Sequence, residues 1–230
     1  MKERRAWARF FVGSVLAAYL ILTGYLFYAE KNVEVSSGAV WKQPEKIKKI
    51  ALTFDDGPHP VYTPMLLDGL KKRGVRATFF LMGSAAEKYP DIVKQIADDG
   101  HLIGNHTFHH VSLENADEKM IQREVVSANE LIEEISGEYP QFIRPPFGQC
   151  DKQVENQTGM LCVLWNIDPL DWCTADASKV VQRVLKNARD NGIILMHDQY
   201  KTSVMAVFTV IDELQKQGYE FVTVDEILLD

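Results

Sequence analysis

Two adjacent carboxylates, Asp55 and Asp56, follow a short apolar segment and come directly before Gly57-Pro58. The segment 50–54 alternates and favours extended backbone, so it predicts a buried strand that Gly57-Pro58 ends. Because neighbouring side chains of a strand point to opposite sides, the two carboxylates can have different partners and different roles. One of them could bind a metal ion while the other acts as a general base, although an isolated Asp-Asp-Gly-Pro sequence is also typical of a simple turn.

A pair of histidines, His106 and His110, follows the third predicted strand. Their spacing would put both imidazoles on one face of a helical turn. Together with one aspartate they would form a metal site with two histidines, one carboxylate and a free position for water or substrate. His109 is also at a tolerable distance in sequence from His106, so spacing alone leaves His109 and His110 as alternatives. We expect His59 and His101 to be structural.

Polar residues also follow three later segments that we predict as strands. They are Arg-Pro-Pro-Phe-Gly at 144–148, Asp-Pro-Leu-Asp-Trp at 168–172 and Leu-Met-His-Asp at 195–198. The first is a rigid turn whose arginine could hold a carboxylate. Each motif is weak by itself, but polar motifs at the ends of so many strands favour one shared site over a set of unrelated turns.

The elements that must position these residues alternate along the chain from Lys49 onward. The segments that we predict as strands are 50–54, 77–81, 101–104, 142–144, 161–165, 193–196 and 221–224. Alternation of strands and helices predicts an α/β fold with a parallel sheet, closed or partly closed as a barrel. In such folds the active site lies at the C-terminal ends of the strands, where the polar motifs are.

Helix signals fill the gaps between the predicted strands. Ser84 with Glu87, and Asn115 with Glu118, have the spacing of capping boxes and predict helix starts. The longest amphipathic segment has apolar residues at helical spacing, which predicts one buried face: Ile121, Val125, Ala128, Ile132 and Ile135.

The N-terminal part of the chain has the pattern of a membrane anchor. Several lysines and arginines precede the uncharged segment 10–28. At ~1.5 Å per helical residue this segment spans roughly 28 Å, close to the ~30 Å hydrocarbon core of a bilayer. We therefore expect 1–30 to be a cytoplasmic basic tip and an uncleaved signal-anchor helix, 31–48 a juxtamembrane linker and 49–230 a domain outside the membrane. A cleavable signal peptide is the alternative, but a small-x-small cleavage site does not follow the apolar segment.

Composition narrows the possible partners. The formal net charge of −7 argues against a nucleic acid partner, since binding a phosphate backbone needs a basic surface. Three cysteines, Cys150, Cys162 and Cys173, are few for a disulfide framework. We expect them to be incidental, although one bond between two of them is possible.

Taken in chain order, the polar motifs resemble the five motifs of the NodB-homology polysaccharide deacetylases, carbohydrate esterase family four. The matching residues are 53–58, 106–110, 144–148, 171–172 and 195–197. The resemblance extends from Ile50 to the C-terminus and implies a distorted (β/α) barrel with about seven parallel strands. Within the family, the chain resembles membrane-anchored peptidoglycan N-acetylglucosamine deacetylases.

The resemblance assigns a metal centre and a general base. Asp56, His106 and His110 would bind a divalent metal ion, usually Zn²⁺, although Co²⁺, Mn²⁺ or Ni²⁺ could use the same ligands. It therefore selects His110 over His109. Asp55 would be the general base that takes a proton from water.

The resemblance also assigns a general acid and its supporting residues. His197 would be the acid, Asp171 would tune it, and Arg144 would orient the base Asp55. The side chains expected to contact the substrate are Pro146, Phe147, Trp172 and Leu195. The family usually has tyrosine at position 147, but its role there is a backbone N–H donated to the oxyanion, which phenylalanine keeps.

The function that follows is a metal-dependent hydrolase that removes N-acetyl groups from amino sugars of a cell-wall polysaccharide, with peptidoglycan N-acetylglucosamine as the expected substrate. An O-acetyl esterase or a chitooligosaccharide deacetylase would use the same site. A non-catalytic wall-binding protein is a further alternative. With its anchor in place, the protein would be a single-pass membrane protein with a cytoplasmic N-terminus and a catalytic domain on the bacterial cell surface.

Overall fold

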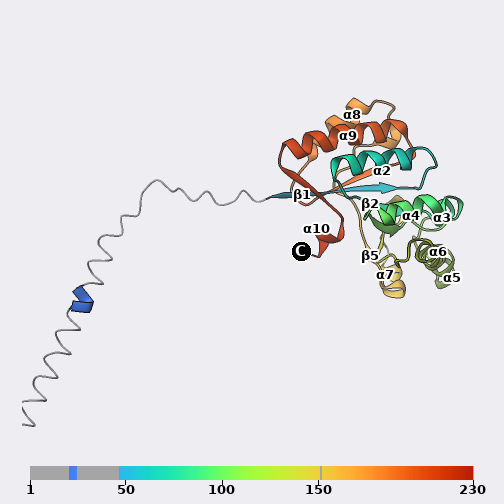
Figure 1. The fold of residues 1–230 in the computed structure, drawn as a ribbon. Helices are drawn as coiled ribbons and strands as arrows, with labels where there is room; N and C mark the ends of the chain where they lie inside the picture. The colour runs from blue at the N-terminus through green and yellow to red at the C-terminus, as the bar shows by residue number, and fades with distance from the viewer. Residues whose placement is uncertain (1–20, 25–46, 151, 230) are drawn as a thin grey trace, which may run out of the picture. The chain divides into compact units, whose positions relative to one another are not determined.

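The computed structural model describes residues 21–24, 47–150 and 152–229 (Figure 1). Contacts divide the chain into two units between Lys46 and Ile47. In the first unit, residues 21–24 are helical and exposed. Among the residues that the structure describes, no helix is both long enough and apolar enough to cross a membrane. Apart from 21–24, the predicted anchor lies outside these residues, as does most of the predicted linker.

One sheet of seven parallel strands forms the centre of the second unit. Its strands are β1 (Lys48–Asp55), β2 (Thr78–Leu81), β3 (Leu102–Asn105), β4 (Phe142–Ile143), β5 (Leu161–Cys162), β6 (Gly192–His197) and β7 (Tyr219–Val222). Each overlaps one of the predicted segments, so the predicted parallel α/β fold is confirmed. The order is β5-β4-β3-β2-β1-β6, and β7 pairs with the first half of β1.

The sheet is curled into a half-barrel. Ile167, which follows the edge strand β5, forms an isolated bridge with Ile194 of the other edge strand, β6. The bridge brings the two edges toward one another and is consistent with the barrel that the family resemblance implies. The strand β1 pairs with β6 from Ile50 to Asp55 and with β2 from Thr53 to Asp55.

Helices pack around the sheet. They are α2 (Tyr62–Arg73), α3 (Gly83–Lys88), α4 (Pro90–Asp98), α5 (Glu118–Ile121), α6 (Ser127–Ser136), α7 (Lys152–Thr158), α8 (Ala177–Asn187), α9 (Lys201–Lys216) and α10 (Asp225–Leu228). A π-helical turn, η1 (Gln122–Val126), joins α5 to α6, and two 3₁₀ turns are η2 (Pro146–Gly148) and η3 (Asp171–Cys173). Figure 1 shows α2, α8 and α9 together on one side of β1.

The two faces of β1 have different surroundings, as the alternation of its sequence predicts. Ile50, Leu52 and Phe54 belong to the main core, which the leucines of α2 and the valines of α9 complete. Ala51 points to the other side and joins a second cluster, inside the half-barrel, with residues of β2, β4 and β6. Asp55 follows in the same register as Ala51, so its carboxylate reaches the interior of the half-barrel at the end of the strand.

The predicted helix starts need correction. The helix α3 begins at Gly83 after Met82, without a side-chain cap, so Ser84 lies inside the helix. The helix α5 begins after Asp117, whose carboxylate accepts a hydrogen bond from the Met120 N–H, and not after Asn115. The apolar stripe from position 121 to 135 is packed in the core as predicted. Its helix, however, is interrupted by η1.

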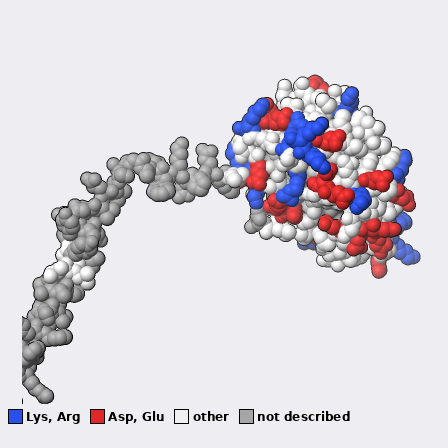
Figure 2. All heavy atoms as spheres, viewed as in Figure 1, with Lys and Arg blue, Asp and Glu red and all other residues white. Residues whose placement is uncertain are grey.

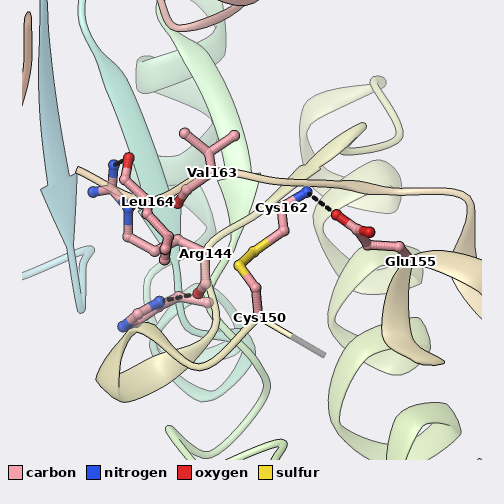
Figure 3. The surroundings of a disulfide bond; sticks show 7 residues. Arg144, Cys150, Glu155, Cys162, Val163 and Leu164 are labelled. Carbon is pink, nitrogen blue, oxygen red and sulfur yellow. Dashed lines mark hydrogen bonds between the residues drawn. A yellow bond between two sulfur atoms is a disulfide. The ribbon is translucent and has the colours of Figure 1, made fainter. Parts of the chain in front are cut away.

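Two of the three cysteines form a disulfide, Cys150–Cys162, and Cys173 is free and exposed (Figure 3). The bond ties the loop after η2 to β5, and the Cys162 N–H donates to Glu155 of α7 at 3.3 Å. The expectation that the cysteines are incidental is therefore wrong for this pair, and the one bond that the sequence allows is formed.

Charged side chains of both signs are intermixed on the face of the molecule in Figure 2. Lysine and arginine lie beside aspartate and glutamate on this face, so they do not build a continuous basic band there.

Candidate active site

Asp55, the last residue of β1, is buried and paired with an arginine. Its Oδ1 accepts a hydrogen bond of 2.8 Å from Arg144, and Asp55 lies opposite His197 in the parallel register of β1 and β6. The second oxygen, Oδ2, is 4.0 Å from His106 Nε2. Arg144 therefore holds one carboxylate oxygen of Asp55, and the other is turned toward the predicted metal ligands.

Arg144 is fully buried, and each nitrogen of its guanidinium group has a partner. Figure 3 shows it beside Val163 and Leu164. It donates to the Thr53 hydroxyl at 2.6 Å, to the Val163 carbonyl at 3.0 Å and to the Leu164 carbonyl at 3.3 Å, in addition to Asp55. Breaking a buried ion pair by removing one partner costs about 3–5 kcal/mol, because the remaining charge has no compensation. The sequence therefore needs arginine at this position to pair with Asp55 and fix it inside the fold.

The predicted metal ligands converge. Nε2 of His106 and Nε2 of His110 each lie 3.3 Å from Asp56 Oδ1, and the three ligand atoms are all within 4.8 Å of one another. Asp56 Oδ1 is buried and forms no hydrogen bond. A buried carboxylate oxygen without a donor is costly unless a cation binds it. The residues present therefore fit a divalent metal ion bound by one carboxylate and two imidazoles.

The charge states of these groups suit metal binding. Burial by itself raises the pKa of Asp56, but the neighbouring His106, His197 and His110 outweigh it and hold the pKa below its ordinary value. For His110, burial lowers the pKa. The charge of Asp56 works in the opposite direction, but burial and the neighbouring His106 outweigh it. Asp56 is therefore a carboxylate and His110 a neutral imidazole at neutral pH, as metal ligands must be.

One contact fixes the ring of His106. Its Nδ1 lies within hydrogen-bond distance of the Arg144 backbone carbonyl, so Nδ1 carries the proton. The other ring nitrogen, Nε2, faces Asp56 and is available to bind a metal ion. Arg144 thus supports both halves of the site: its side chain holds Asp55 and its carbonyl orients His106.

The two histidines meet for a different reason from the predicted one. Residues 106–110 are not helical, and Thr107 and His110 have φ values of 63° and 56°, in the left-handed region. The prediction that a helical turn aligns His106 and His110 is wrong, although the pair itself is correct. His109 points elsewhere, with its Nδ1 at 3.2 Å from both oxygens of Glu124, so it does not belong to the ligand cluster.

His197, the last residue of β6, is anchored twice to Asp171. The His197 N–H donates to one carboxylate oxygen at 2.9 Å, and its Nδ1 lies 2.9 Å from the other. Burial by itself lowers the pKa of His197, but Asp171, with Asp55 and Asp56 further away, outweighs it and raises the pKa to about 9. His197 is therefore protonated at neutral pH, and its Nε2 is the atom that can release a proton.

A cavity of about 440 Å³ contains the reacting groups. Its lining residues are Asp55, Asp56, His106, His110, Pro145, Phe147, Trp165, Asp168, Trp172, Leu195, His197 and Tyr200. Phe147 and Trp172 are 68% and 54% exposed at its rim, and Leu195 is buried. Among the predicted contacts with substrate, Phe147, Trp172 and Leu195 line the cavity.

Four features of the lining differ from the prediction. Pro146 is buried and is replaced in the lining by Pro145. Trp165, Asp168 and Tyr200 were not predicted as site residues. Each belongs to or closely follows a predicted strand or motif, and an aromatic or acidic residue at such a position was the signal that could have identified it.

The two histidines predicted to be structural lie outside the cavity lining. Burial lowers the pKa of His101 to about 4, and its Nδ1 accepts from the Ala77 N–H at 3.1 Å. His59 accepts from the N–H groups of Val61 and Tyr62 at the start of α2. Both use a ring nitrogen to satisfy backbone donors.

Residues 42–162 match the family model described as polysaccharide deacetylase, and the chain belongs to this family. The resemblance found in the motifs is therefore confirmed. The match covers β1 to β5 and includes Arg144 and the cluster of Asp56, His106 and His110.

Several relatives of the chain are named as bacterial peptidoglycan deacetylases. The chain is 39% identical over 180 residues to the peptidoglycan-N-acetylglucosamine deacetylase PgdA of Listeria monocytogenes, with 78% of the chain aligned but only 39% of that longer protein. A peptidoglycan-N-acetylglucosamine deacetylase of Bacillus cereus is 37% identical over 206 residues, which cover 86% of the chain and 96% of that protein.

A third relative has both an assigned name and a solved structure. The peptidoglycan-N-acetylmuramic acid deacetylase PdaC of Bacillus subtilis is 39% identical over 180 residues, 78% of the chain and 38% of that protein. Its solved structure superimposes with a TM-score of 0.76 at 38% identity, covering 79% of the chain and 90% of the solved one. The fold is thus shared with enzymes named for two different sugars of peptidoglycan.

Proposed function

We propose that the chain is a metal-dependent peptidoglycan deacetylase that removes the acetyl group from N-acetylglucosamine. The observation that carries this proposal is the cavity that joins a paired carboxylate, Asp55, a protonated histidine, His197, and a metal-fitting cluster. Hydrolysis of an acetamide needs a base for the attacking water, stabilisation of the oxyanion and an acid for the leaving nitrogen. The relatives named above support peptidoglycan as the polymer.

Asp55 is suited to be the general base. Arg144 occupies its Oδ1, so Oδ2 is available to take a proton from the water that attacks the acetyl carbon. The strand end and the buried arginine fix the position of this oxygen, which saves the reorganisation that a mobile base would need.

His197 is suited to be the general acid. Asp171 binds its Nδ1, so the proton to be released is on Nε2. When the bond between the acetyl carbon and the sugar nitrogen breaks, the nitrogen takes this proton, and the products are acetate and a free amine. His197 then regains a proton from solvent.

Asp56, His106 and His110 would hold the metal ion. When bound, a divalent ion polarises the acetyl carbonyl and lowers the pKa of a coordinated water. Zn²⁺ is the proposed occupant because imidazole and carboxylate ligands with an open position suit it, and Co²⁺, Mn²⁺ and Ni²⁺ are alternatives that could use the same ligands. The backbone N–H of Phe147, at the cavity rim, is the proposed donor to the oxyanion.

The choice of sugar rests on the names of the relatives. The Listeria monocytogenes and Bacillus cereus proteins support N-acetylglucosamine, while PdaC supports N-acetylmuramic acid at a similar identity. An O-acetyl esterase and a chitooligosaccharide deacetylase would use the same acid and base. A purely wall-binding role is less well supported, because the base, the acid and the whole ligand cluster are present together.

The proposed location is the outer face of the cell membrane, with a single N-terminal anchor and a cytoplasmic N-terminus. The uncharged segment 10–28 and the basic residues before it support this arrangement. The Cys150–Cys162 disulfide gives independent support, since such bonds persist in oxidising compartments outside the cytoplasm. Cell fractionation tests the proposal: full-length protein in the membrane fraction is expected, and mature protein in the medium without residues 1–30 would contradict it.

The substrate is tested by analysing wall fragments. Peptidoglycan from cells that make the protein, and from cells that make the Asp55→Asn variant, is digested and examined by mass spectrometry. We expect fragments that lack one acetyl group on N-acetylglucosamine only when the wild-type protein is made. Loss of acetyl from N-acetylmuramic acid alone would show that this sugar, and not N-acetylglucosamine, is the substrate. A fully acetylated wall would contradict deacetylation.

A further inference from the structure

A buried carboxylate, Glu124, faces the metal-binding loop but has no part in the mechanism above. It lies in the π-helical turn η1 and is 2% exposed. A π turn inside an α-helix is rare and occurs often at functional sites. We call residues 106–110, which carry two of the three proposed metal ligands, the histidine loop.

Glu124 binds the backbone of the histidine loop. Its Oε2 accepts a hydrogen bond of 3.0 Å from the His109 N–H, and both of its oxygens lie 3.2 Å from His109 Nδ1. Arg123 donates to Oε1 at 2.9 Å and compensates the buried charge. Because His109 directly precedes His110, this carboxylate fixes the chain one residue away from a proposed ligand.

The histidine loop needs external support. Thr107 and His110 both adopt left-handed backbone conformations, and for residues with a side chain each costs about 1–2 kcal/mol. Such conformations persist only where surrounding contacts impose them. Contacts of this kind exist on both sides of the loop.

On one side, N–H groups at the start of α3 bind the loop carbonyls. Gly83 N–H donates to the Thr107 carbonyl at 3.0 Å, and Ser84 N–H to the Phe108 carbonyl at 2.9 Å. On the other side, Glu124 binds the His109 N–H. Donors at the start of α3 therefore hold two carbonyls of the loop, and an acceptor from η1 holds its His109 N–H.

A second link joins η1 to the same loop. Asn105 donates through Nδ2 to the Val125 carbonyl at 3.0 Å, and its Oδ1 accepts from the Thr107 N–H at 2.7 Å. The π turn therefore supplies both a buried carboxylate and a backbone carbonyl to the segment that carries His106 and His110. A regular α-helix would use that carbonyl for its own hydrogen bond.

We propose that Glu124 is a positioning residue for the metal centre: by accepting from the His109 N–H, it holds His110 in place for metal binding before an ion arrives. This inference rests on the proposed function of His110 as a ligand. Residues that orient metal ligands typically contribute 10–100-fold to metal affinity. Glu124 acts through the backbone. Its removal should therefore weaken the affinity of the metal-free protein for a metal ion while all three ligand side chains are still present.

The test compares three variants of the full-length chain, purified in detergent and stripped of metal. In Glu124→Ala the acceptor is removed. In Glu124→Gln an amide oxygen can still accept from the His109 N–H. Glu130→Ala is the matched control, because it removes the same charge from an exposed position on the adjoining helix α6. The zinc dissociation constant is measured by competition with a chromophoric chelator, below the melting temperature of every variant.

We expect Glu124→Ala to weaken zinc binding by about 10–100-fold, Glu124→Gln to recover most of that loss and Glu130→Ala to bind as the wild type does. Amide hydrogen exchange supplies a second readout without metal: the His109 amide should exchange faster in Glu124→Ala than in Glu130→Ala. A role in stability alone would lower the melting temperature and leave the zinc affinity of the folded protein unchanged.

A folded Glu124→Ala variant with wild-type zinc affinity would overturn the inference. If this variant does not fold, the Glu124→Gln variant provides the test. Rapid hydrogen exchange of its His109 amide together with wild-type zinc affinity would also overturn the inference. A wild-type protein that binds no zinc would instead contradict the proposed function, so the two failures are distinguishable.

Discussion

The contact between Asp171 and His197 allows a quantitative prediction for the Asp171→Asn variant. Burial works against the charged imidazole, yet the pKa of His197 is raised to about 9, with Asp171 as the nearest cause. Asparagine keeps a side chain of the same shape and removes the charge. We therefore expect the pKa of His197 to fall by roughly two units or slightly more, to about 6.5–7, close to its ordinary value, although Asp55 and Asp56 retain part of their effect.

The sign of the effect on activity follows from the role of His197 as an acid. An acid works while it is protonated, so kcat/KM falls as the pH rises through its pKa. Near pH 7.5, a pKa of 9 leaves almost every His197 protonated, whereas a pKa of about 6.5–7 leaves about a tenth to a quarter of them protonated. The variant should therefore lose roughly four- to tenfold in kcat/KM near pH 7.5 and recover most of that loss near pH 6.

The assay is a pH profile of kcat/KM for acetate release from about pH 5.5 to about pH 10. Asp168→Asn is the control, because Asp168 lines the same cavity but its carboxylate accepts from the Leu170 N–H at 2.8 Å. Its alkaline limb should match the wild type. An unchanged alkaline limb in Asp171→Asn, or a loss of the same size at every pH, would refute the argument from charge.

Three further variants test other parts of the account. Asp55→Asn should lose about 10²-fold or more in kcat while its metal content, measured by atomic emission, stays unchanged; equal loss of metal would show that the base and ligand roles are exchanged. Phe147→Tyr should change kcat/KM by less than about twofold, since the useful group is the backbone N–H, and a large rise would show that a hydroxyl contributes. Replacing Cys150 and Cys162 by serine removes a bond between residues separated by 12 positions. The double variant should lose about 3 kcal/mol of unfolding free energy in urea titrations, and Cys173→Ser almost none.

The parallel sheet could be predicted because its strands are short apolar segments bounded by turn residues. The segment 161–165 shows the limit of that reasoning. Its pairing with β4 ends at Cys162, and Ile167 then forms a bridge with Ile194 of β6. Pairing between residues far apart in sequence leaves no mark on local periodicity, so neither the short length of β5 nor the curling of the sheet could be read from the residues there.

The structure brings together the three residues predicted as metal ligands, but the family resemblance was needed to choose His110. Local spacing suggested a helical turn, whereas the left-handed conformations of Thr107 and His110 depend on contacts from α3 and η1. Glu124 could not be predicted at all, because a glutamate on an amphipathic helix is ordinarily exposed. Its burial depends on the π turn, which local periodicity did not predict.

The most direct test of the central claim is metal-dependent release of acetate. Full-length protein is stripped of metal, titrated with zinc and incubated with peptidoglycan labelled in the acetyl group of its N-acetylglucosamine. We expect labelled acetate to appear in proportion to bound zinc until one ion per chain is reached, and the Asp56→Ala variant to release none at the same zinc concentration. Equal release by verified metal-free protein, or no labelled acetate at any zinc concentration, would contradict the account.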